Sequence, residues 1–158
     1  MDRAHRDQLD VTASPNGDGH PVVAAAQWSG DAIPEEVARL RSAAGTFASG
    51  FGAPDALVDD VRLAISEALS NVIMHAYPGG PGRLDTRANA DPASGLVTFS
   101  VRDYGIGFRP RPDSPGAGMG VPIMTSLAQA IEIATHADGG TEVHLTFAVP
   151  PAASGRLV

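Results

Sequence analysis

Three short motifs contain the residues that could do chemistry, and the first pairs a carboxylate with an amide. Glu67 and Asn71 are four residues apart in segment 63–77, where apolar residues recur at helical spacing. On a helix this spacing places both side chains on one side, with His75 a further turn along. The pair could serve as a proton acceptor and a ligand for a hard cation, or it could be an ordinary solvated helix face.

The second motif places an aspartate and two glycines directly after an expected strand. In Asp103-Tyr-Gly105-Ile-Gly107 the aspartate could accept a hydrogen bond from the exocyclic amine of a flat base, and the glycines would let that base come close. The same residues could equally form a simple tight turn, because glycine adopts positive φ and aspartate bonds to nearby backbone.

The third motif is a glycine-rich stretch that leads into an expected helix. Gly116, Gly118 and Gly120 alternate with other residues just before Pro122, which suits the start of a helix. Free N–H groups at such a helix start can hold an anion. A dinucleotide-binding fingerprint is a poor alternative, because that loop should follow the first strand of its unit and this one comes late in the chain. A loop without a ligand remains the other reading.

The elements that must position these motifs alternate in a simple order: strand, two helices, two strands, helix, two strands. Hydrophobic period, turn residues and helix-start signals predict this order, with Asp55 as the cap of the second helix. The fold class predicted is α+β, a two-layer α/β sandwich with a mostly antiparallel sheet and its helices on one face. The expected strands cover 20–28, 83–89, 96–101, 131–135 and 141–149, and the expected helices cover 33–50, 55–77 and 121–128.

Length and composition predict one domain with a flexible segment at each end. The 158 residues are 43% hydrophobic and 18% charged, which suits one soluble domain with one core. Residues 1–19 are polar and predict a flexible arm, 20–149 the domain, and 150–158 a tail. Aromatic residues make up only 5% of the chain, so the core should rest on aliphatic side chains. No apolar run predicts a membrane span, and the first residues lack the apolar stretch of a secretory signal.

Charge and missing residue types exclude several classes of function. The net charge of −7 argues against broad binding to nucleic acid or an anionic membrane. The chain has no cysteine, which excludes disulfides and thiolate chemistry and fits a cytoplasmic location. It also has no lysine, so neither a P-loop nor the strand lysine of a protein-kinase-like site is available.

With its three motifs in this order, the sequence resembles the Bergerat-fold (GHKL, histidine-kinase-like) ATPases. Glu67-x-x-x-Asn71 resembles their N box, Asp103-x-Gly105-x-Gly107 their G1 box, and Gly116-x-Gly118-x-Gly120 their G2 box. Thr141 falls where these proteins carry a threonine on a late strand. Segment 66–77 is most similar to the bacterial anti-sigma-factor serine/threonine kinases. The resemblance covers about residues 33–149.

The resemblance implies ATP and Mg²⁺ as ligands and gives each motif residue a role. Glu67 would be the general base and Asn71 a ligand of Mg²⁺. Asp103 would accept a hydrogen bond from the adenine amine, helped by Gly107 and by a water on Thr141. The remaining glycines, which would let backbone approach the nucleotide, are Gly105, Gly116, Gly118 and Gly120.

The resemblance also implies partners. Such a protein would bind a sigma factor and keep it from RNA polymerase, and it would phosphorylate a serine or threonine of an anti-anti-sigma (STAS) protein. A homodimer is implied as well, with the first strand and first helix as its surface. The alternative is a module that binds its partner in an ATP-dependent way without phosphotransfer. Glu67 favours the kinase, because a pure clamp needs no base.

Four further residues have two open interpretations each. Arg109 and Arg111 could supply the basic side chain that the family places near the γ-phosphate, or could be solvated loop charges. His75 could be a structural neighbour of the pocket or a participant in it. Trp28 could lie in the core or at the edge of a dimer.

Overall fold

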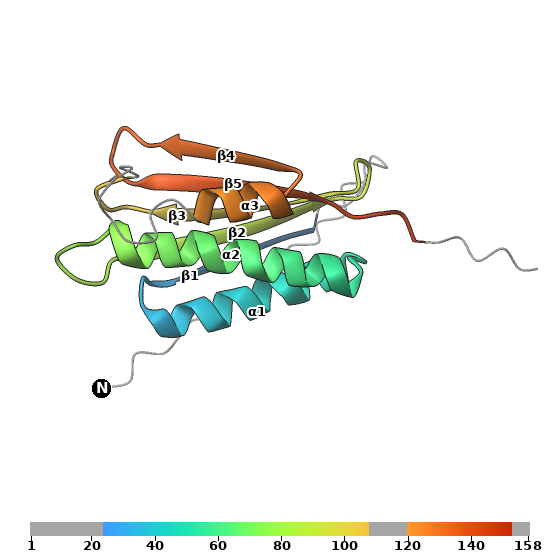
Figure 1. The fold of residues 1–158 in the computed structure, drawn as a ribbon, viewed down its shortest axis with the longest axis horizontal. Helices are drawn as coiled ribbons and strands as arrows, with labels where there is room; N and C mark the ends of the chain where they lie inside the picture. Colours follow the sequence, from blue (N-terminus) through green and yellow to red (C-terminus); the bar gives the residue numbers. More distant parts are fainter. Residues whose placement is uncertain (1–23, 108–119, 153–158) are drawn as a thin grey trace, which may run out of the picture.

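In the described part of the chain, three helices pack on one face of a five-stranded antiparallel sheet, which makes two layers (Figure 1). The computed structural model describes residues 24–107 and 120–152. The elements, in chain order, are β1 (Ala24–Asp31), α1 (Pro34–Gly50), α2 (Asp55–His75), β2 (Arg83–Asp91), β3 (Leu96–Asp103), α3 (Gly120–Leu127), β4 (Ala130–Thr135) and β5 (Thr141–Ala148). The predicted fold class and order of elements are therefore confirmed.

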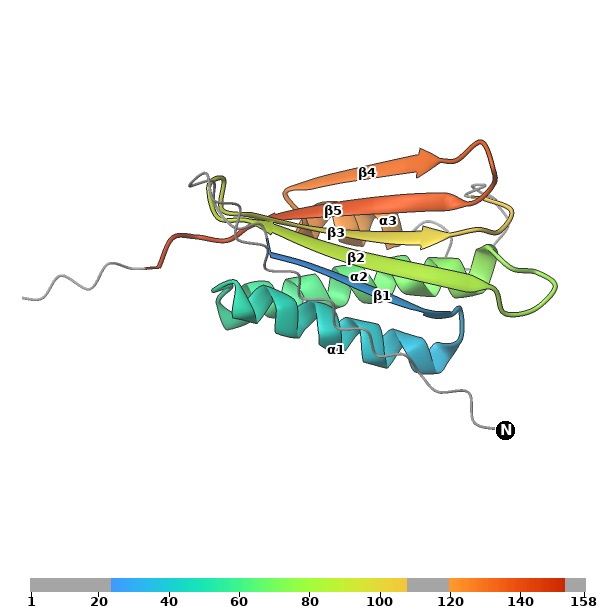
Figure 2. The same cartoon turned by 180° about the vertical axis from the view of Figure 1, so that it is seen from behind.

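The strands lie in the order β1-β2-β3-β5-β4, and every neighbouring pair is antiparallel. Seen from behind, the sheet lies in front of all three helices (Figure 2). We call this face, opposite the helices, the outer face. Because side chains alternate along a strand, residues that follow one another in β3 point to opposite faces. Asp103 thus belongs to the helix-covered face and Arg102 to the outer face.

The two long helices begin and end where the sequence signals are strongest. α1 begins at Pro34, with Glu35 and Glu36 in its first turn, and ends at Gly50. α2 begins at Asp55, but the residue in the cap position is Pro54 and no side chain caps the helix. The prediction that Asp55 caps α2 is therefore wrong by one residue, because the extended backbone that a cap requires is already set by Pro54.

The core lies between the helices and the covered face of the sheet. Leu40, Ile65 and Met124 come from the three helices and are fully buried against sheet residues such as Val97 and Leu145. Although aromatic residues are few, four of them form a row of edge-to-face contacts with ring centroids 6.0–6.4 Å apart, namely Trp28, Phe47, Phe99 and Phe147. The aliphatic core expected from composition is therefore completed by an aromatic row that runs from β1 to β5.

Four strands extend beyond their predicted bounds, and the first of them, β1, continues to Asp31. β2 continues to Asp91, β4 begins at Ala130, and β3 continues to Asp103, so the aspartate of the second motif is the last residue of a strand. The predicted arm 1–19, residues 20–23 of the first predicted strand and residues 153–158 of the tail lie outside the described residues. Within the described ranges, no helix is long and apolar enough to cross a bilayer.

Thr86 provides a test of how this core is built. It lies on the covered face of β2 between Trp28 and Val101 and is fully buried, and among the described residues its hydroxyl has no hydrogen-bond partner. A buried hydroxyl without a partner costs roughly 1–3 kcal/mol. We expect Thr86→Val to raise the free energy of unfolding, measured with urea, by about 1 kcal/mol.

Thr98→Val is the matched control, because the Thr98 hydroxyl is paired with that of Thr146 at 3.2 Å on the outer face. This variant should not gain stability. A loss of stability in Thr86→Val would contradict the expectation.

Candidate functional site

Four of the predicted site residues, Asn71, Asp103, Gly107 and Thr141, line a hollow between α2, α3 and the ends of β3 and β5. Its walls are mostly apolar side chains, and four polar side chains face it. The lining consists of Ala68, Asn71, Val72, His75, Ala76, Val101, Asp103, Gly107, Val121, Met124, Ile133, Thr141 and Val143. A mostly apolar hollow with a few polar groups is the usual form of a small-molecule site.

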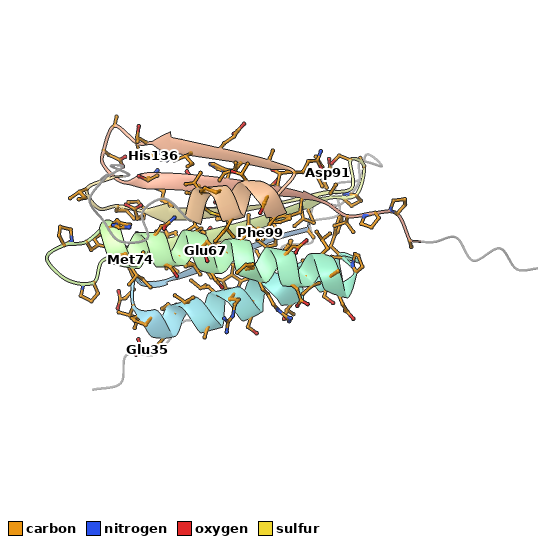
Figure 3. All side chains as sticks on the ribbon, viewed as in Figure 1. Glu35, Glu67, Met74, Asp91, Phe99 and His136 are labelled. Atoms are coloured by element: carbon orange, nitrogen blue, oxygen red, sulfur yellow. The ribbon has the colours of Figure 1, made fainter. Side chains whose placement is uncertain are left out.

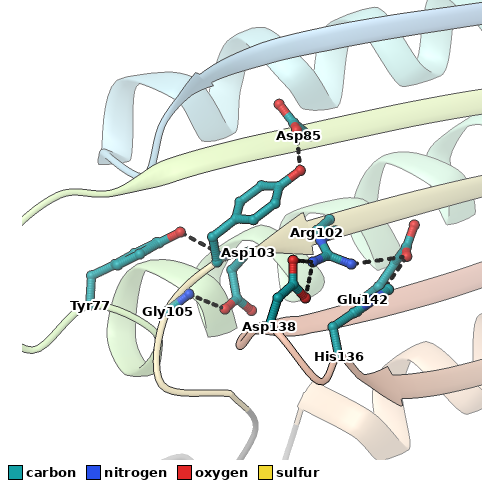
Figure 4. A network of polar contacts seen from close by, with 9 residues as sticks. Tyr77, Asp85, Arg102, Asp103, Gly105, His136, Asp138 and Glu142 are labelled. Carbon is teal, nitrogen blue, oxygen red and sulfur yellow. Dashed lines mark hydrogen bonds and ion pairs between the residues drawn. The ribbon is translucent and has the colours of Figure 1, made fainter.

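Asp103 is the one carboxylate among the described residues of this lining, and it is only 4% exposed. Its Oδ1 accepts a hydrogen bond of 3.0 Å from the N–H of Gly105 (Figure 4), and the carboxylate also accepts one from the N–H of Thr141. Burial raises the pKa of Asp103 above its ordinary value, although both N–H groups favour the charged form. A carboxylate in this state is a strong acceptor for a donor that enters the hollow.

Two glycines hold the backbone close around Asp103. A Cβ on Gly105 would collide with the carbonyl of Ala76 at the end of α2, and a Cβ on Gly140 would collide with the carbonyl of Asp103. Gly107 has a φ of +83°, which a residue with a side chain rarely adopts. Gly105 and Gly107 were among the predicted site residues. Gly140 was not, because its contact with Asp103 joins segments far apart in the chain.

Asn71 faces the first residue of α3. A Cβ on Gly120 would lie 3.0 Å from the Asn71 Nδ2, so the two elements touch at this point. Within the described ranges the half-buried amide of Asn71 has no hydrogen-bond partner. The structure thus brings the asparagine of the first motif to the last glycine of the third. His75 also lines the hollow, one turn further along α2.

Glu67 is placed differently from the other predicted residues. It lies on α2 one turn before Asn71 and is half-buried (Figure 3). It is not among the described residues that line the hollow.

Five of the residues considered in the sequence are not among the described residues that line this hollow. Gly116, Gly118, Arg109 and Arg111 lie outside the described residues. Trp28 is 7% exposed and packs against Phe47, so its assignment to the core is confirmed.

The described residues also limit how a metal ion could be held. They include no group of three or more histidine or acidic side chains that could hold one. Mg²⁺ commonly takes one or two oxygen ligands from the protein and the rest from water and substrate phosphates. The free amide oxygen of Asn71 fits that pattern, with a bound molecule supplying further oxygens.

The apolar walls of the hollow were not predicted as site residues. Val72 and Ala76 belong to the helical apolar period of α2, and Val101 and Val143 to the covered face of the sheet. Their sequence signal is the same as that of core residues, so only the three-dimensional arrangement separates them from the core.

Residues 31–147 match the family described as the histidine kinase-like ATPase domain. The chain is also similar to the anti-sigma F factor of Clostridium beijerinckii, with 32% identity over 100 residues, which cover 54% of this chain and 67% of that protein. The anti-sigma F factor of Bacillus cytotoxicus is 29% identical over 98 residues, which cover 55% of this chain and 66% of that one. The chain thus spans about two thirds of the length of these relatives.

A similar fold occurs in a crystal structure of the RsbU and RsbW domains of a Mycobacterium tuberculosis protein. The TM-score is 0.62 at 23% identity, over 79% of this chain and 32% of the other. At that identity the likeness concerns the fold.

The contact of Gly105 with α2 can be tested by adding one carbon. Gly105→Ala would force the backbone of the 103–107 turn away from the carbonyl of Ala76, which cannot move aside as a side chain could. We expect a loss of about 2 kcal/mol in the free energy of unfolding, measured with urea. In Gly79→Ala the new Cβ would meet nothing within 4 Å, so this control should change stability little. Equal losses in the two variants would refute the close approach.

Proposed function

The chain belongs to the histidine kinase-like ATPase family, and from that membership we propose that it is an ATP-dependent serine/threonine protein kinase that acts as an anti-sigma factor. The observation that carries the proposal is the buried carboxylate of Asp103 in a mostly apolar hollow that the amide of Asn71 also lines. This arrangement suits a ligand with a flat, amine-bearing base at one end and a metal-bound anion at the other.

Base recognition would fall to Asp103 and the surfaces beside it. Its carboxylate would accept a hydrogen bond from the adenine amine, while Val72, Val101 and Met124 would cover the faces of the ring. Gly107 and the hydroxyl of Thr141 lie next to each other, since a Cβ on Gly107 would be 3.7 Å from that oxygen. Thr141 could therefore hold a water that reaches the base.

The phosphates would lie toward Asn71 and the start of α3. Asn71 would supply an oxygen to Mg²⁺, which neutralises phosphate charge when it is bound. Gly120 would let the N-terminal backbone of α3 approach, and its N–H groups would favour an anion. Gly116 and Gly118 would extend this phosphate-binding backbone.

Glu67 would turn this binding site into a kinase. The hydroxyl oxygen of the partner's serine or threonine would form a bond to the γ-phosphorus, and the bond from that phosphorus to the bridging oxygen of ADP would break. Glu67 would take the hydroxyl proton. Positioning supplies most of the catalysis in such transfers.

The partners are proposed from the relatives. The proteins it resembles are anti-sigma F factors, so we propose a sigma factor as the bound partner and a STAS protein as the phosphate acceptor, both in the cytoplasm. A homodimer through β1 and α1 remains a prediction.

One observation keeps a second function under consideration. Glu67 is absent from the described lining of the hollow, whereas Asn71 and Asp103 are part of it. A module that binds its partner when ATP is bound, without phosphotransfer, would need only Asn71 and Asp103.

Two alanine variants separate these functions. We expect Glu67→Ala to bind ATP–Mg²⁺ as the parent does but to lose at least about 100-fold in transfer of labelled phosphate to a STAS protein from the same genome. Asp103→Ala should lose most of its affinity for ATP, measured by calorimetry. Transfer at the parent rate by Glu67→Ala would remove it as the base, and full-strength binding by Asp103→Ala would rule out the adenine assignment.

The pH dependence of ATP binding should follow Asp103. Because its pKa is raised, the carboxylate takes up a proton at a higher pH than an ordinary aspartate does. Only the ionised form is a full acceptor for the amine, so ATP affinity should fall as the pH is lowered through this raised pKa. Purine riboside triphosphate has no such amine and shares the phosphate titration. The ratio of its dissociation constant to that of ATP should therefore fall toward acidic pH, and a constant ratio would contradict the assignment.

A further inference from the structure

The position of Asp103 depends on a turn that is anchored from outside the hollow. Three contacts dock this 103–107 turn on the end of α2. The N–H of Ile106 donates to the carbonyl of Ala76 at 3.0 Å, and Gly105 packs directly on that carbonyl. The third contact comes from the Tyr77 side chain, which is not among the residues that line the hollow.

The hydroxyl of Tyr77 joins three segments. It accepts a hydrogen bond of 2.8 Å from the N–H of Tyr104 (Figure 4). It also donates one of 2.5 Å to the carbonyl of Arg83. A Cβ on Gly82 would collide with the Tyr77 ring, so the ring lies directly on the backbone before β2. One side chain therefore links the end of α2, the start of β2 and the residue next to Asp103.

The side chain of Tyr104 takes no part in this link. It lies on the outer face, where its hydroxyl donates to Asp85 and its ring lies beneath Arg83 and Arg102, with the guanidinium carbons 5.1 and 4.6 Å from the ring centroid. Only the backbone N–H of Tyr104 meets Tyr77. The two tyrosines thus have different roles. Tyr77 fixes the backbone beside Asp103, whereas the side chain of Tyr104 is held on the outer face.

We propose that Tyr77 is a positioning residue for base recognition: its hydroxyl holds the backbone beside Asp103 so that the carboxylate meets the amine of the base. This inference rests on the proposed function, because it takes the adenine amine as the group that Asp103 reads. Tyr77 itself does not touch the nucleotide. Its hydroxyl acts through the N–H of Tyr104, one peptide from the carboxylate that binds.

The test compares Tyr77→Phe with Tyr104→Phe, each measured by calorimetry with ATP and with purine riboside triphosphate. The ratio of the two dissociation constants reports what the amine contributes. We expect Tyr77→Phe to lower this ratio about fivefold, the effect of roughly one hydrogen bond. Tyr104→Phe removes the same atom but leaves the backbone link, so its ratio should stay within about twofold of the wild type.

Further variants separate positioning from a loss of folding. Tyr77→Phe added to Asp103→Ala should leave the ratio unchanged, since the acceptor is already gone. If Tyr77→Phe does not fold, Gly82→Ala displaces the same ring while keeping the hydroxyl, and it should lower the ratio in the same direction.

Several outcomes would overturn the inference. An unchanged ratio in Tyr77→Phe, or an equal loss of affinity for both nucleotides, would show a purely structural role. If Asp103→Ala still abolished the discrimination in that case, the proposed function would stand. A wild-type protein that does not discriminate between the two nucleotides would overturn both the inference and the adenine assignment.

Discussion

The contact between Gly105 and the carbonyl of Ala76 is the constraint on which the rest of the site depends. The last carbonyls of a helix have no partner within the helix. Here the carbonyl of Ala76, the C-cap residue of α2, accepts a hydrogen bond from the N–H of Ile106, so the turn after β3 caps the helix. The same contact joins the layer that carries Asn71 to the layer that carries Asp103. One contact therefore both caps the helix and holds the two halves of the site together.

The two faces of the sheet are stabilised by different interactions. The covered face is mostly apolar and ends in Asp103, whereas no helix of the described ranges lies over the outer face, which is held by polar contacts. On that face Asp85 is 2% exposed; burial alone would raise its pKa, but hydrogen bonds from Tyr104, Ser29 and Arg83 together lower it. Arg102 similarly reaches Asp138 at 3.2 Å and Glu142 at 4.0 Å. Matched charges thus let polar residues be buried without a second helical layer.

Sequence reasoning recovered what local pattern encodes. The apolar period of α2 and the glycines after β3 predicted where Asn71 and Asp103 would lie, because helix spacing and turn chemistry depend on near neighbours. The closeness of Gly140 to Asp103 depends on the pairing of β3 with β5, which no local pattern reveals. The missing partner of the Thr86 hydroxyl is likewise set by strands that are distant in the chain. Glu67 was expected at the site from its spacing and from the family resemblance, and its role stays a prediction, because it is not among the described residues that line the hollow.

The aromatic row has a practical consequence for spectroscopy. The chain has a single tryptophan, Trp28, which lies on β1 at one end of that row, with its ring 6.4 Å from that of Phe47 on α1. In the sheet, β2 separates β1 from the strand that carries Asp103. Fluorescence from this indole therefore reports how α1 packs on the sheet and comes from a place apart from the hollow. Trp28 fluorescence thus reports whether the core is packed. A variant that has lost packing can therefore be distinguished from one that has lost only ligand binding.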